Sequence, residues 1–348
     1  MLVNKYLSKF IAFEICFLVV ISLCIYFGLI PDVSPVESGF HDDRNYLDPN
    51  FTIPRSELWS NNFIFYQIII FLNHSPFLIR GFNLLLIALI ASKLIDLYKG
   101  NKILVNLLLV SLVFSTYVIS KEYLILYLVF TLLSILDENK FNFKNVFLVI
   151  IFSVALFFLR SIFALIILSL FIYKVNNRLK LTLVTLVVFY IAFFYDDLLI
   201  FYQNNVIRSI ELYFEGKNYG LNSQSGSLSS IYSGSIFYSI FQLFFLPIIG
   251  KFNYLYNSFI FFPILNIIAI PALVKVFFKR KNSFILFSII LMIILIAINF
   301  GSNYRYKLSF TVMLIIGLMK LDFKINNISN FLILLWVIFT LALMPIRF

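Results

Sequence analysis

The chain has 348 residues, of which 62% are hydrophobic and only 12% are charged, and its mean hydropathy is +0.99. A soluble domain of this size would carry about 25% charged residues, so the composition excludes an ordinary water-soluble enzyme and predicts a polytopic all-α membrane protein. The net charge of +11 alone would suggest a nucleic-acid partner, but its distribution along the chain has a different explanation.

The first apolar run, residues 10–30, follows Lys5 and Lys9. It is too long for a signal-peptide core and lacks a small-residue cleavage pattern, so it is predicted to be a retained first span. The two cysteines, Cys16 and Cys24, both fall inside it. We therefore expect no intramolecular disulfide framework.

Further apolar runs predict about eleven transmembrane helices, with the N-terminus inside and the C-terminus outside. The predicted spans are 10–30, 77–98, 103–119, 122–136, 145–159, 160–173, 179–195, 254–278, 283–300, 306–319 and 328–346. Two other apolar stretches, 62–72 and 235–251, are expected to be short re-entrant or amphipathic helices on the outer face. Residues 1–348 thus form one integral membrane domain, with a first outer loop at 31–76 and a large, Ser-rich outer loop at 196–253.

The charges fit this topology, because cytoplasmic loops collect Lys and Arg. Sixteen of the 27 basic residues and five of the 16 acidic residues, Glu14 among them, are assigned to the inner side. The inner side then carries the whole net charge of +11, and the outer side is balanced. The basic character therefore reflects orientation and indicates no nucleic-acid binding.

Several charged and aromatic residues are expected on the outer face. The stretch "GFHDDRNYLDPNF" (39–51) follows the first span and contains Asp42, Asp43 and Tyr46. Other outer residues are predicted from the turns and loops between later spans: Arg80, Lys121, Glu122, Arg160, Arg208, Tyr304, Arg305, Tyr306 and Lys307. We expect Asp42, Asp43, Arg80, Arg160 and Arg305 to converge at the outer membrane–water boundary.

These residue types suit chemistry on a lipid-linked sugar. A carboxylate such as Asp43 or Asp42 can act as general base toward a hydroxyl. Guanidinium groups match phosphate oxygens in bidentate geometry, and a lipid-linked sugar holds its diphosphate at headgroup depth. The two histidines have no partner at metal-ligand spacing, so no cofactor is indicated, and the role of a divalent metal stays open.

Each candidate also has a structural interpretation. Adjacent acids in an outer loop are often simply solvated, and an arginine at a helix end often reaches toward the lipid headgroups. The tyrosines also suit an interfacial aromatic belt.

Several motifs resemble the GT-C class of membrane glycosyltransferases and the O-antigen polymerases of the Wzy type. They are "HDDRNY" (41–46), "SPFLIRGFNLLLIALIASKLIDLY" (75–98), "YVISKEYLILYLVF" (117–130), "FFLRSIFALIIL" (157–168) and "NYRYKLSF" (303–310). In GT-C enzymes a first-loop Asp acts as base, and Wzy-type polymerases have ten or more spans, a large outer loop and functional outer arginines. Ser309 stands where that class usually has proline. The chain has no large soluble C-terminal domain, as many GT-C enzymes have, and no R-x10-G spacing in its outer loops, as some polymerases have.

The resemblance implies a GT-C-like fold in a bacterial inner membrane and a polymerase of undecaprenyl-diphosphate-linked repeat units of O-antigen or capsule. Its catalytic residues would be Asp43 and Asp42. Its phosphate-binding residues would be Arg80, Arg160, Arg305, Lys307, Lys121 and Arg208, with Tyr46, Tyr304 and Tyr306 on the sugars. The substrates are lipid-linked oligosaccharides, and a chain-length regulator and a flippase are the expected protein partners.

Two other functions remain open. One is a GT-C glycosyltransferase that uses a polyprenyl-phosphate sugar. The other is a transporter or flippase of the same lipid-linked oligosaccharide, which would favour charged groups near the bilayer midplane. We expect the formal charges at span ends, which favours the enzyme.

Overall fold

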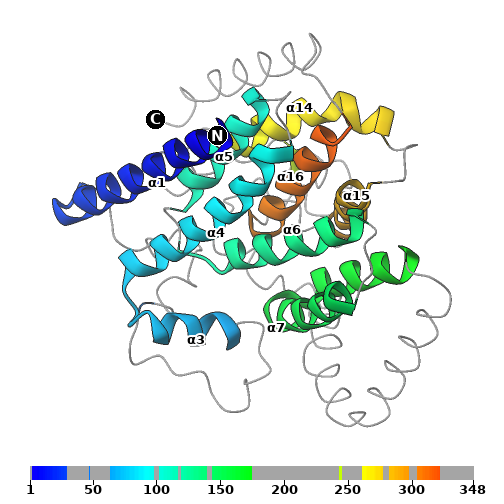
Figure 1. The fold of residues 1–348 in the computed structure, drawn as a ribbon, viewed down its shortest axis with the longest axis horizontal. Coiled ribbons are helices and arrows are strands. Elements are labelled where there is room, and N and C mark those ends of the chain that lie inside the picture. The colour runs from blue at the N-terminus through cyan, green and yellow to red at the C-terminus, as the bar shows by residue number, and fades with distance from the viewer. Residues whose placement is uncertain are drawn as a thin grey trace, which may run out of the picture.

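The computed structural model describes residues 2–29, 47, 63–97, 102–116, 119–138, 143–174, 243–244, 261–276, 282–297 and 304–321. Within these ranges the regular secondary structure is entirely helical, without a strand (Figure 1). The predicted all-α class is therefore confirmed for the described part of the chain.

The helices follow the predicted apolar runs closely. They are α1 (Leu2–Tyr26), α3 (Phe63–Phe71), α4 (Pro76–Leu97), α5 (Lys102–Ser115), α6 (Glu122–Glu138), α7 (Phe143–Lys174), α14 (Phe261–Val276), α15 (Ser283–Ala297) and α16 (Tyr304–Met319). The expected outer-face segment at 62–72 contains the short helix α3. The runs 179–195 and 328–346 lie outside the described residues, so the count of about eleven spans stays a prediction.

Two described helices are long and apolar enough to cross a membrane, over Tyr6–Tyr26 in α1 and Pro76–Leu94 in α4. Only 11% of the apolar window in α1 is buried by the rest of the protein, and side chains such as Ile15 and Val20 are more than half exposed. Extended apolar surface of this kind is unfavourable in water and normal against lipid. The pattern suggests a membrane protein. Shorter apolar helices cover Ile103–Ser115, Asn145–Arg160, Ile162–Tyr173, Ser283–Leu295 and Leu308–Met319.

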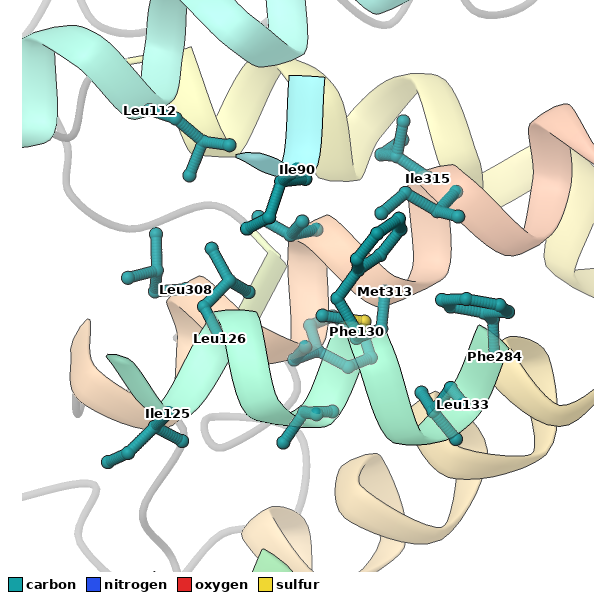
Figure 2. Close-up of a cluster of buried hydrophobic side chains, with 14 of the residues drawn as sticks. Ile90, Leu112, Ile125, Leu126, Phe130, Leu133, Phe284, Leu308, Met313 and Ile315 are labelled. Atoms are coloured by element: carbon teal, nitrogen blue, oxygen red, sulfur yellow. The ribbon is translucent and has the colours of Figure 1, made fainter. Parts of the chain in front are cut away.

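Helix α6 lies at the centre of the bundle and packs against α4, α7, α15 and α16 (Figure 1). Its side chains Leu126 and Phe130 join Ile90 of α4 and Met313 of α16 in one apolar cluster, shown in Figure 2. Phe130 also stacks at a tilt on Phe284, with ring centroids 5.9 Å apart. Burial on several sides explains why α6 is apolar around most of its circumference.

Helices α6 and α16 run in the same direction. Figure 2 places Leu308 of α16 beside Leu126 of α6, and Lys320 just after α16 is bound to Asp137 near the end of α6. Both helices therefore begin at one end of the bundle, which we call the N-terminal end of α6.

Helix α4 begins at the same end. Short connections join α4 to α5 and α5 to α6, and such connections make successive helices antiparallel, so α4 and α6 are parallel. The Lys93 ammonium lies 5.8 Å from the Phe130 ring centroid, which shows the register of the two helices. In contrast, α15 begins at the opposite end, where the Ser283 N–H donates to Asp137 Oδ1 at 2.7 Å.

One acidic residue departs from the predicted charge distribution. Glu14, assigned to the inner side, lies inside the candidate span Tyr6–Tyr26, near its middle. Its side chain is buried, and its Oε1 has no hydrogen-bond partner. The expectation that formal charges sit only at span ends is therefore wrong for Glu14. Buried residues of α1 share one stripe, Phe10, Glu14 and Ile21, and this helix packs against α4.

Candidate functional site

The start of α6 is fixed by a local cap. The Glu122 N–H donates to Ser120 Oγ at 3.2 Å, and the Ile125 N–H donates to the Lys121 carbonyl at 3.1 Å. A serine hydroxyl satisfies one of the free N–H groups of a first helical turn, and an acid there interacts favourably with the helix dipole. The cap therefore holds Lys121 and Glu122 in fixed positions, and both side chains are buried.

The helix α7 breaks at Arg160, whose backbone angles of φ −163° and ψ 87° are not helical. The break divides the apolar stretch into Asn145–Arg160 and Ile162–Tyr173, where the sequence predicts the boundary between two spans. Carbonyl groups at a helix end lack their usual partners. The Leu159 carbonyl finds one outside the helix, because Lys121 Nζ donates a hydrogen bond to it at 3.1 Å.

The same break brings Arg160 to Glu122. Arg160 Nη2 donates to Glu122 Oε1 in an ion pair, with the Glu122 side chain only 1% exposed. The second carboxylate oxygen of Glu122, Oε2, is buried without a hydrogen bond. Lys121, Glu122 and Arg160 together carry one net positive charge. We call these three residues the α6–α7 charge cluster.

Arg80 and Asn83 lie on α4, which packs on α6. Arg80 lies near the start of α4 and is only 4% exposed, and Asn83 is fully buried. Asn83 lies ten residues before Lys93 on α4, and Glu122 lies eight residues before Phe130 on α6. These separations correspond to about 15 Å and about 12 Å of helix. The Lys93–Phe130 contact thus places Asn83 and Glu122 at a similar level along the bundle. Arg80 lies about one turn closer than Asn83 to the N-terminus of α4.

The first turn of α16 reaches this level as well. It contains Tyr304, Arg305, Tyr306 and Lys307. Arg305 lies fifteen residues before Lys320, and Glu122 lies fifteen before Asp137, so both stand about 22 Å from the Lys320–Asp137 contact. The structure describes the backbone of this turn, and the roles of its side chains stay predictions.

The structure brings some of the predicted site residues to one end of the bundle, and their roles stay predictions. Lys121, Glu122 and Arg160 are in contact, and Arg80 and the backbone of the α16 turn lie at the same end of the bundle. Asp42, Asp43, Tyr46 and Arg208 lie outside the described residues, so their roles stay predictions. Three parallel helices, α4, α6 and α16, also direct their N-termini to this end, which adds positive partial charge.

No metal centre is formed by the described side chains, since none of them gather three or more His, Cys, Asp or Glu residues. The one His in the described ranges, His74, lies in the turn between α3 and α4, with its ring 6.2 Å from that of Tyr66. His74 and Asn73 both have positive φ. His74 therefore contributes to a tight turn.

Two features of interest escaped the sequence-based prediction. Asn83 was noted only as part of a motif, although its amide nitrogen and oxygen both lack hydrogen bonds. Glu14 was assigned to a face by its position near the N-terminus, yet it is the one acid inside the first apolar run. A charged residue within an apolar run is itself a signal for function.

Comparison with known proteins adds no assignment: no protein-family model, curated protein or solved structure matches the chain.

Proposed function

We propose that the chain is a multi-pass glycosyltransferase of the bacterial inner membrane. Its N-terminus would face the cytoplasm, and it would polymerise undecaprenyl-diphosphate-linked repeat units at the outer face. The observation that carries the proposal is the α6–α7 charge cluster, a largely buried group with excess positive charge at the end of the bundle where α4 begins and carries Arg80. Buried ionisable groups among apolar helices are costly and usually serve a function.

The cations suit the leaving group of such a reaction. The hydroxyl of an incoming unit would attack the anomeric carbon of the growing glycan, and the bond from that carbon to the diphosphate oxygen would break. The glycan moves to the new unit, and undecaprenyl diphosphate leaves. Arg80, with Arg160 and Lys121, would stabilise the charge that develops on the diphosphate. Asp43 or Asp42 would take the hydroxyl proton.

The internal pairing of the cluster is compatible with this role. Arg160 is held by Glu122, and Lys121 is held by the Leu159 carbonyl, so neither cation needs a ligand to remain in place. Such fixed donors stabilise developing charge without reorganising during the reaction. The arrangement also has a purely structural interpretation, because Lys121 satisfies the Leu159 carbonyl at the break in α7. Substitutions must therefore be measured for folding as well as for activity.

A direct test is reconstitution in proteoliposomes with lipid-linked repeat units from the source organism. We expect a ladder of longer glycans attached to lipid and release of undecaprenyl diphosphate. Addition of a single sugar from a polyprenyl-phosphate donor would instead identify the other glycosyltransferase function. A preparation that is folded but yields neither product would refute glycosyl transfer.

One observation favours the transporter or flippase as a second candidate. Glu14 is buried near the middle of a candidate span without a partner for Oε1, and transporters commonly place ionisable groups at that depth. The same proteoliposomes can test this by following movement of a labelled lipid-linked oligosaccharide between leaflets. Movement that Glu14→Gln abolishes, with no glycan extension by the unmodified protein, would favour transport.

A further inference from the structure

Asn83 is an unusual buried polar residue in this bundle. Its side chain is fully buried in α4, and neither its amide nitrogen nor its amide oxygen has a hydrogen-bond partner. Two other buried asparagines each use their amide nitrogen: Asn266 Nδ2 donates to the Leu243 carbonyl at 3.1 Å, and Asn282 Nδ2 donates to the Gly317 carbonyl at 3.1 Å. Asn83 is therefore not retained for a contact within the described fold.

A buried amide without partners lowers stability, because water is lost and no hydrogen bond replaces it. An apolar residue of similar volume would remove that cost. Unsatisfied groups of this kind in a folded protein call for an explanation, and binding of a ligand is one.

The position of Asn83 indicates which ligand. It follows Arg80 by one helical turn, and the register of α4 on α6 places it at about the level of Glu122. Glu122 contributes a second buried atom without a hydrogen bond, Oε2. Arg80 would face the phosphates of the proposed substrate, so the next turn inward would face the group attached to them.

We infer that Asn83, together with Glu122 Oε2, forms a subsite for the hydroxyl groups of the sugar next to the diphosphate. This inference rests on the proposed function. An amide offers a donor and an acceptor, and a carboxylate offers an acceptor. A phosphate oxygen could satisfy only the amide donor. Two neighbouring sugar hydroxyls both donate and accept, so together they can satisfy all three groups. Because both side chains are closed off from solvent, the sugar reaches them only when the helix ends move apart.

The test compares Asn83→Leu with Asn266→Leu, two substitutions of a fully buried asparagine. Asn83→Leu should raise the thermal unfolding temperature of the detergent-solubilised protein, because it removes two unpaired atoms. Asn266→Leu also removes one unpaired atom, Oδ1, but it should lower the unfolding temperature because the Leu243 carbonyl loses its donor. If Asn83→Leu lowers the unfolding temperature as Asn266→Leu does, Asn83 has a structural role and the inference is wrong.

Binding is measured with two probes, undecaprenyl diphosphate and undecaprenyl diphosphate that carries one N-acetylhexosamine. We expect the unmodified protein to bind the sugar-bearing probe more tightly. Asn83→Leu should lose about tenfold in affinity for that probe through the lost hydrogen bonds and keep its affinity for the plain diphosphate. Asn83→Ala serves as a second variant if the leucine side chain does not fit.

The outcomes separate this inference from the proposed function. If the unmodified protein binds neither probe, the lipid-diphosphate site itself is refuted, and the sugar subsite with it. If it binds both probes equally, or if the Asn83 variants bind the sugar-bearing probe as tightly as the unmodified protein, only the sugar subsite is wrong.

Discussion

Lys320 Nζ donates a hydrogen bond to Asp137 Oδ2 at 2.8 Å, which joins two helix ends that are 183 residues apart in the chain. The other oxygen of Asp137 accepts the Ser283 N–H at 2.7 Å. The Lys320 ammonium also lies 4.5 Å from the Phe284 ring centroid. One carboxylate therefore connects the end of α6, the region just after α16 and the start of α15, at the end of the bundle opposite to the α6–α7 charge cluster.

The stability of this junction should depend on pH. Burial raises the pKa of Asp137, but the hydrogen bonds from Lys320 and Ser283 and the Lys320 charge outweigh it and hold the pKa below its usual value. A lowered folded-state pKa gives a stabilisation that is complete above the unfolded-state pKa and is lost as pH falls through the folded-state pKa. We expect the unfolding temperature to fall in that acidic range, measured by thermal scans in detergent.

The matched control for this prediction is Glu138→Gln, at an exposed neighbouring position. Asp137→Asn should lower stability at neutral pH by about 1–3 kcal/mol and flatten the acidic transition, whereas Glu138→Gln should leave that transition in place. An unchanged acidic transition in Asp137→Asn would show that another group causes it.

Gly317 allows a close approach between α16 and α15. A Cβ at Gly317 would lie 2.6 Å from Ile285 Cγ1 and 3.1 Å from the Ile285 backbone nitrogen. Gly317→Ala should therefore destabilise the protein by about 1–3 kcal/mol through overpacking. Gly81→Ala is the control, because its Cβ would meet only Leu18 Cδ2 at an ordinary 3.8 Å. Equal unfolding temperatures for both variants would contradict this packing.

Substitution of arginine by lysine should separate phosphate binding from contact with lipid headgroups. An arginine that only reaches the headgroups tolerates lysine, whereas a planar bidentate contact to phosphate does not. We expect Arg305→Lys to lose most polymerase activity and Arg80→Lys and Arg160→Lys to lose a substantial part, at matched expression. Arg347→Lys, near the C-terminus, should be silent. Full activity of all three variants would leave these arginines as membrane anchors.

Arg160→Lys needs a second measurement, because Arg160 is also paired with Glu122. A structural role would lower the unfolding temperature and reduce activity in proportion. A catalytic role would reduce the rate of glycan extension in protein that unfolds at the normal temperature.

The proposed general base lies in the first outer loop. Asp43→Asn or Asp42→Asn should abolish or strongly reduce glycan extension, because a positioned general base contributes about 10²–10⁴-fold, and Asp43 is the preferred candidate. Membrane insertion should be unchanged, as measured by the amount of protein in the membrane fraction. Normal glycan ladders from both variants would rule out this catalytic role.

The membrane orientation can be tested with single cysteines and an impermeant thiol reagent. Cys16 and Cys24 are free thiols, and Cys16 is exposed, so both should first be replaced by serine. We expect labelling in intact spheroplasts at positions 43 and 305 and protection at positions 140 and 280. The reverse pattern would invert the proposed topology and move the charge cluster to the cytoplasmic side.

The sequence by itself determined where the described helices lie, although α1 begins at Leu2 and ends at Tyr26 rather than spanning 10–30, and α5 ends at Ser115 rather than at 119. Long apolar runs with few charges need no partner to be identified, because their length and composition match a membrane span. The break at Arg160 was also predictable, since a single charge between two apolar runs marks a boundary. The sequence also indicated that Lys121, Glu122 and Arg160 belong to one face.

Only the tertiary structure decided which of these charges are partners. Glu122 binds Arg160 and Asp137 binds Lys320, pairings that depend on which helices pack side by side and in which register. It also showed that Glu14 is buried with an unpaired oxygen and Asn83 with both amide atoms unpaired, whereas the Asn266 amide nitrogen donates to the Leu243 carbonyl. Local periodicity fixes which residues share a face of one helix, but burial and hydrogen bonding depend on the neighbouring helix that covers that face.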